Sequence, residues 1–108
     1  MARLDPSVRR ELARFETKIS AMRLNGMRYL TKQLHGHPSS ETSVNKVISN
    51  QLALAMSDLA MTLLGSEGQL AGVEQFRSLA MHGSVIGGGA PNIQRNIIAE
   101  RILGLPKD

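Results

Sequence analysis

Residues 41–64 read ETSVNKVISNQLALAMSDLAMTLL, and this stretch decides the fold. Apolar residues recur along it in steps of three and four, which places them on one face of an α-helix. A second apolar line runs beside the first, and a helix that is apolar nearly all round is buried on several sides. The first line comprises Val44, Val47, Ile48, Leu52, Ala55, Leu59 and Leu63, and the second comprises Leu54, Met56, Ala60, Met61 and Leu64.

Helical spacing continues on both sides of this stretch. A long helix is predicted over residues 5–34, because Asp5 can cap it and Pro6 suits its first turn. Shorter helices are expected over residues 72–82 and 91–103, and no segment alternates with the period of a β-strand. The sequence therefore predicts one all-α domain over residues 1–108. Its expected form is a four-helix, up-and-down bundle with two long helices and a shorter C-terminal pair.

The first helix is long for so short a chain. Its apolar stripe keeps its phase across Asn25 and Gly26, which favours a close approach by another helix over a break at this point. At 1.5 Å per residue the helix would measure roughly 45 Å, more than a compact domain of this size can cover. We therefore expect further helices along its length, either in a larger bundle or in an oligomer.

Composition excludes several classes of protein. The chain has no Cys, so disulfide scaffolds, cysteine nucleophiles and zinc–thiolate sites are ruled out, and a cytoplasmic location is expected. No metal site is expected, because His35, His37 and His82 lack a completing ligand. We expect no membrane partner either, because no apolar run approaches the roughly 18 residues of a membrane span. The N-terminus shows no secretory signal.

The net charge of +4 leaves two interpretations open. The basic residues are spread over both ends of the chain, which is typical of a solvated helix surface, although a patch for phosphate groups would look similar. A nucleic-acid-binding surface is not expected, because only three aromatic residues are available for stacking on bases.

A glycine run at residues 87–89, followed by Ala90 and Pro91, is the most distinctive local motif. Three glycines expose backbone N–H groups and let a ligand come close to the chain. The run matches neither the phosphate-binding loop of nucleotide hydrolases nor the dinucleotide-binding pattern. From the residues alone, a flexible hinge and a ligand-binding turn are both open.

Residues 92–106 read NIQRNIIAERILGLP, which resembles the C-terminal end of the acyl-CoA dehydrogenase family. Val44, Asn45 and Lys46, with the long helix that follows them, resemble the family's lysine-containing helix. The resemblance implies a flavoenzyme with an N-terminal helical domain, a middle β-domain and a C-terminal helical bundle, of which this chain matches only the last, without its first helix. In the family reaction a carboxylate removes the α-proton of an acyl-CoA thioester and FAD accepts the β-hydride.

The same resemblance implies cofactor-binding positions around the glycine run. Gly89 matches a family glycine, and Asn92 stands at a flavin-contact position where Glu or Gln is usual. Ala90 replaces a threonine that touches the flavin. Gly88 occupies the position of the catalytic glutamate found in many members, so no catalytic residue is assigned to this chain.

A second flavin contact in the family is made across the subunit interface by a Gln-x-x-Gly-Gly turn. It maps onto the residues that end the second long helix, and a threonine stands in place of the glutamine. The implied positions are Thr62, Leu63, Leu64, Gly65 and Ser66.

The resemblance implies a C-terminal domain of a flavin-dependent acyl-CoA dehydrogenase that binds FAD and acyl-CoA within a homo-oligomer, either a dimer or a tetramer. The isolated chain is expected to be inactive. The alternative is a non-catalytic helical module that oligomerises or pairs with a full-length dehydrogenase subunit. The acyl-chain specificity is not indicated by the sequence.

Overall fold

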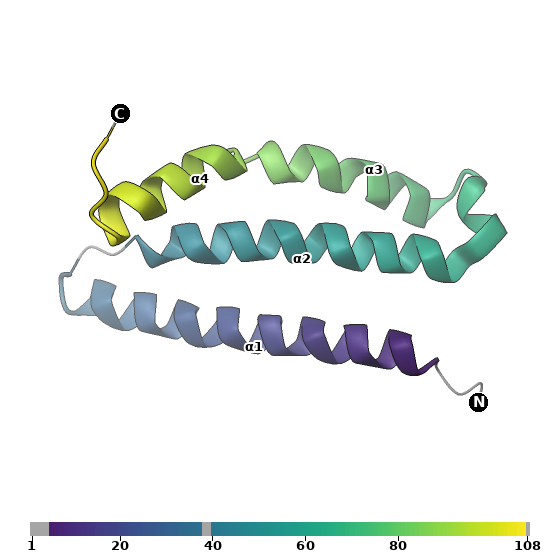
Figure 1. Ribbon diagram of the computed structural model, residues 1–108, viewed down its shortest axis with the longest axis horizontal. Coiled ribbons are helices and arrows are strands. Elements are labelled where there is room, and N and C mark those ends of the chain that lie inside the picture. The colour runs from purple at the N-terminus through teal and green to yellow at the C-terminus, as the bar shows by residue number, and fades with distance from the viewer. Residues whose placement is uncertain (1–4, 38–39, 108) are drawn as a thin grey trace.

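The computed structural model describes residues 5–37 and 40–107, and over these residues the chain is helical without strands. Figure 1 shows three antiparallel layers: α1 (Pro6–Leu34), then α2 (Glu41–Leu64), then α3 (Val73–Ile86) and α4 (Pro91–Ile97) lying end to end. The predicted all-α fold, with two long helices and a shorter C-terminal pair, is confirmed. Because α4 continues in the direction of α3, the pair together spans α2.

Local capping explains where α1 begins and ends. Asp5 accepts a hydrogen bond of 2.7 Å from the backbone N–H of Ser7, and Pro6 occupies the first turn. At the other end Gly36 has φ +73°, and the N–H of His37 donates to the carbonyl of Lys32 at 2.9 Å. These contacts satisfy backbone groups that a helix leaves free at its ends. Both ends of the predicted helix are therefore confirmed, while Pro38 and Ser39 lie outside the described residues.

Asn25 and Asn45 join α1 to α2. The Nδ2 group of Asn25 donates to Oδ1 of Asn45 at 2.9 Å, and Nδ2 of Asn45 donates to the carbonyl of Met22 at 3.0 Å. Gly26 lies beside this pair, where an added Cβ would stand 3.8 Å from Nδ2 of Asn45. The expected close approach of another helix at Gly26 is confirmed, and α1 passes through it unbroken.

The C-terminal half differs from the prediction in its boundaries. Helix α2 ends at Gly65, with φ +57°, and a 3₁₀ turn η1 (Gly65–Gln69) leads to α3. Helix α3 continues four residues beyond the predicted end at His82, because its last turn packs against α2 and Val85 receives a side-chain hydrogen bond from Asn50. Helix α4 passes into a π-helical turn η2 (Ile98–Ile102).

The described chain has almost no interior of its own. Phe15 and Leu52 are the buried apolar residues among those described. The radius of gyration is 17.2 Å, against about 13 Å for a compact domain of this length, and the extents are 49 × 29 × 23 Å. The expectation that the long helices do not form a compact monomer is confirmed.

Helix α3 shows the same incompleteness most clearly. Helical periodicity puts Phe76, Leu79 and Ile86 on one face, and their exposed fractions are 73%, 76% and 67%. Met81 and Val85 lie on the opposite face of the helix and are half-buried. The more apolar face of α3 therefore points away from the rest of the chain.

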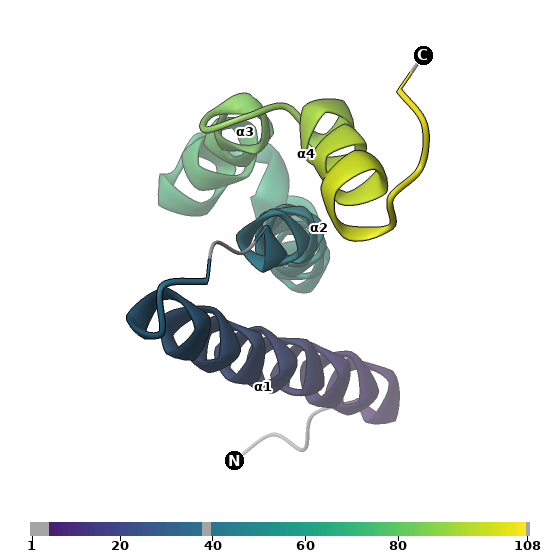
Figure 2. The same cartoon turned by 90° about the vertical axis from the view of Figure 1, so that its left-hand side faces the viewer.

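Helix α2 together with η1, Glu41–Gln69, is long and apolar enough to cross a membrane by length and composition. The sequence-based statement that no stretch comes near this limit is therefore wrong, because scattered polar residues interrupt the apolar run without lowering its average enough. A single helix of this kind is weak evidence for a membrane span. Figure 2 shows α2 between α1 and the α3–α4 layer, the place of a core helix in a bundle.

Candidate functional site

A groove lies where the joint between α3 and α4 crosses α2. Its volume is about 380 Å³, within the usual range for small-molecule sites. One wall comes from α2 and the other from the end of α3 and the start of α4 (Figures 1 and 2). The lining residues are Val47, Asn50, Gln51 and Leu54 from α2, and Val85, Ala90, Pro91, Asn92 and Arg95 from the other wall.

The turn beside this groove depends on glycine. Gly88 has φ +73° and Gly89 has φ +111°, conformations that residues with a Cβ rarely adopt. The side chain of Gln94 folds back over the turn and donates to the carbonyl of Gly88 at 3.3 Å. The same side chain occupies the space that a Cβ at Gly89 would take. The turn is therefore a shaped element held by Gln94, and the hinge interpretation of the glycine run is not favoured.

Asn50 holds this turn against α2. It is 8% exposed, and its Nδ2 group donates to the carbonyl of Val85 at 3.2 Å. Val85 lies two residues before the glycine run, so this bond sets the height of the turn above α2. Sequence reasoning missed Asn50, although an amide on the apolar helix at residues 41–64 was a usable signal.

Lys46 lies at one end of the same turn. A Cβ built at Gly88 would stand 3.7 Å from Cε and 3.8 Å from Nζ of Lys46. Lys46 is half-buried and forms no ion pair with any residue that the structure describes. Sequence reasoning noted Lys46 as part of a family-like helix and did not place it at the site.

The structure brings the first set of predicted cofactor positions together. Gly88, Gly89, Ala90 and Asn92 form the turn and its exit, and Ala90 and Asn92 line the groove. The Oδ1 atom of Asn92 accepts a hydrogen bond from Arg95 at 3.4 Å. With no Cβ at two positions and only a methyl group at Ala90, the turn lets a flat ring approach its backbone, so these residues fit a flavin edge.

The second predicted set lies elsewhere. Residues 62–66 close the far end of α2, and the 12 residues from Asn50 to Thr62 correspond to about 18 Å of helix. The hydroxyl of Thr62 donates to the carbonyl of Asp58 at 2.8 Å, and Leu63 is 57% exposed. Within one chain the two sets therefore belong to different sites, the arrangement needed if the second set contacts a cofactor bound by another subunit.

No acidic side chain lines the groove among the residues that the structure describes. Gly88, at the family base position, offers no carboxylate, and its positive φ disfavours one there. No group of three or more His, Asp or Glu residues gathers within residues 5–37 and 40–107. The described site can bind and position a ligand, but it holds no recognisable proton acceptor for α-proton removal.

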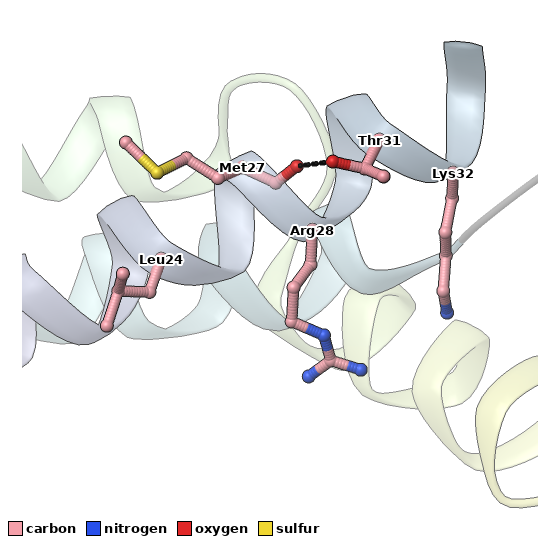
Figure 3. Close-up of a pocket in the computed structure, with 5 residues that line it drawn as sticks. All are labelled: Leu24, Met27, Arg28, Thr31 and Lys32. Atoms are coloured by element: carbon pink, nitrogen blue, oxygen red, sulfur yellow. Dashed lines mark hydrogen bonds between the residues drawn. The ribbon is translucent and has the colours of Figure 1, made fainter. Parts of the chain in front are cut away.

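A second depression lies on the outer surface of α1 and has a volume of about 580 Å³. Figure 3 shows its five lining residues, all of which come from this one helix: Leu24, Met27, Arg28, Thr31 and Lys32. The Thr31 hydroxyl is already bonded to the carbonyl of Met27 at 3.0 Å. Since a single helix forms the whole depression, we assign it no chemistry and treat it as uncovered helix surface.

Comparison with known proteins now identifies the family. The family described as "Acyl-CoA dehydrogenase, C-terminal domain" matches residues 3–103. This chain belongs to the acyl-CoA dehydrogenase family. Two curated relatives, both named acyl-CoA dehydrogenase IpdE1, are 32% identical in Mycobacterium tuberculosis and 30% identical in Mycolicibacterium smegmatis, each over 96% of this chain. The resemblance seen in residues 92–106 is thus confirmed for the chain as a whole.

The acyl-CoA dehydrogenase match concerns one part of a longer protein. The chain spans 28% and 27% of the two curated relatives. A solved structure named "Tcur3481-Tcur3483 steroid ACAD" superposes with a TM-score of 0.78 over 96% of this chain and 30% of its own, at 23% identity. This likeness shows that the three-layered helical arrangement is a fold found in the family.

Proposed function

We propose that this chain acts as the C-terminal helical domain of a flavin-dependent acyl-CoA dehydrogenase, and that the turn at residues 88–92 lies against the edge of FAD. The observation that carries this proposal is the glycine turn, held by Asn50 and Gln94 over a ligand-sized groove. When bound, FAD supplies the acceptor for the β-hydride of the acyl-CoA thioester. The chain itself contributes backbone approach at Gly88 and Gly89 and an amide at Asn92.

The missing carboxylate at Gly88 limits what this chain does alone. A base must reach the substrate from outside the described residues, so we expect the isolated chain to be inactive, and a cytoplasmic location remains part of the proposal. The test is to purify the chain and to measure flavin absorbance and acyl-CoA oxidation with an artificial electron acceptor. Turnover by the chain alone would contradict the proposed role.

The flavin contact can be tested in the enzyme assembled from this chain and the remaining domains. Ala90→Phe should alter the visible flavin spectrum, because a large ring at the turn would occupy the space proposed for the cofactor edge. The matched control is Ala13→Phe on the exposed surface of α1. An unchanged spectrum in the Ala90 variant, with FAD still bound, would remove the contact.

A second candidate function is that of a non-catalytic subunit which pairs with a full-length dehydrogenase. Two observations favour it: Gly88 and Ala90 lack the side chains that the family uses at the site, and the apolar face of α3 is uncovered. The name of the solved relative joins two designations, as a two-component protein would. Co-expression with full-length family members discriminates, since this candidate requires a stable mixed complex and the first predicts a homo-oligomer.

A further inference from the structure

The corner where Lys46 meets the glycine turn combines features that the proposed flavin contact does not use. The aliphatic end of Lys46 lies against Gly88, which brings its ammonium group to the turn. This ammonium group has no hydrogen-bond or ion-pair partner among the described residues. A half-buried cation without a counter-charge is costly, and an anion in the groove would offset that cost.

The groove beside this corner has the matching shape and polarity. Val47 lies one position along α2 from Lys46, and with Leu54 and Val85 it makes part of the groove wall apolar. Arg95 adds a second cation on the opposite wall, and acidic groups are absent from the lining described above. A ligand that extends from the apolar wall to the turn therefore meets positive charge at its end.

We propose that Lys46 and the Gly88–Gly89 backbone form an anion-recognising corner, which binds the carboxylate or phosphate group of a ligand whose apolar body lies along Val47, Leu54 and Val85. The glycines contribute by the absence of Cβ atoms, which lets an anionic oxygen approach both the backbone and Nζ of Lys46. The inference rests on the proposed function for the nature of the ligand, an acyl compound with an acidic end.

The corner also bears on why position 88 carries no base. A glutamate introduced at Gly88 would start from a Cβ less than 4 Å from Nζ of Lys46. Its carboxylate would pair with the ammonium group, which lowers the basicity of a carboxylate. Lys46 at this place thus suits an acidic ligand better than a catalytic carboxylate on the turn.

The test compares three probes of equal chain length with the full 108-residue chain: octanoate, octyl phosphate and octanol. Binding is followed by NMR through the backbone amide signals of Gly88 and Gly89. We expect octanoate or octyl phosphate to bind about tenfold more tightly than octanol, the usual advantage of a charge-assisted hydrogen bond. The better of the two anions identifies the group that the corner prefers.

Three variants assign the preference to Lys46. Lys46→Met removes the charge and keeps the apolar stem, so the anions should bind no better than octanol. Lys46→Arg should retain the preference, and Lys18→Met, an exposed lysine on α1, should leave it unchanged while altering the net charge equally. Equal binding of anion and alcohol by the unaltered chain, a preference that survives in Lys46→Met, or no binding by a chain with its helical circular dichroism intact would overturn the proposal. Because the readout is binding and not turnover or flavin absorbance, its failure is distinguishable from failure of the proposed dehydrogenase role.

Discussion

The side-chain amide of Asn50 donates a 3.2 Å hydrogen bond to the backbone carbonyl of Val85, and this bond fastens the end of α3 to the middle of α2. Val85 precedes the glycine turn by two residues, so the position of the candidate site depends on a polar contact beneath it. Carbonyls at the end of a helix have no partner within the helix. Asn50 supplies one from a neighbouring helix.

Replacing Asn50 with alanine should therefore destabilise the fold. The carbonyl of Val85 would remain half-buried without its partner, which typically costs about 1–3 kcal/mol. The free energy of unfolding should be measured with urea at one fixed chain concentration, because self-association affects apparent stability. Gln51→Ala, at an exposed neighbouring position, should change stability by less than about 0.5 kcal/mol. Equal effects of the two substitutions would show that the bond to Val85 is unimportant.

Gly26 and Gly89 should respond in opposite directions to alanine. Gly26 has helical backbone angles and open space, with Asn45 at 3.8 Å from an added Cβ, so Gly26→Ala should stabilise by about 0.4–1 kcal/mol. Gly89 has φ +111° and lies under the Gln94 side chain, so Gly89→Ala should cost more than about 1 kcal/mol. Thermal unfolding of both variants beside the unaltered chain measures the difference. Destabilisation by Gly26→Ala would mean that α2 lies closer to α1 than described.

Glu41 should make stability depend on acid. Its hydrogen bond and ion pair with Lys32 lower the pKa of the Glu41 carboxyl below its ordinary value of 4.5. A carboxyl whose pKa is lower in the folded state stabilises the fold above the unfolded pKa, and that contribution is lost as the pH falls through the folded pKa. The unfolding midpoint should therefore fall below about pH 4.5, and Glu41→Gln should flatten this part of the profile.

Lys32→Met provides a second check of the same linkage, because it removes the partner and leaves Glu41 in place. Urea midpoints measured from pH 6 down to about pH 3 should show the same flattening in both variants. Glu16→Gln, an exposed position on α1, serves as the control. A profile for Glu41→Gln that still follows that of the unaltered chain would exclude the Lys32–Glu41 contact as the source of the dependence.

The exposed face of α3 should mediate association. Phe76 is 73% exposed in the middle of that face, and burial of a phenylalanine side chain stabilises a contact by roughly 1.5–3 kcal/mol. Phe76→Asp should therefore shift the chain toward smaller species in sedimentation velocity measurements. Thr42→Asp adds the same charge at the exposed start of α2 and should leave the distribution unchanged. Association that persists unaltered in Phe76→Asp would place the interface on another face.

Several features could be read from local sequence because their causes are local. The spacing of apolar residues sets the helical period, and Asp5, Pro6 and Gly36 act on backbone groups within a few residues of themselves. The bounds of α1 and α2 and the all-helical class were therefore predictable. Residues 92–106 also indicated the family, since a match over such a length needs no three-dimensional information.

The tertiary structure decided what depends on contacts between distant residues. The extra turn of α3 exists because Asn50, 35 positions earlier, bonds Val85. The meeting of Lys46 with Gly88, 42 positions apart, and the separation of the 62–66 turn from the 88–92 turn follow from how the layers stack. Helical periodicity showed which faces are apolar. Only the packed chain showed that the apolar face of α3 is left uncovered, because burial is a property of neighbours and not of a residue's own sequence position.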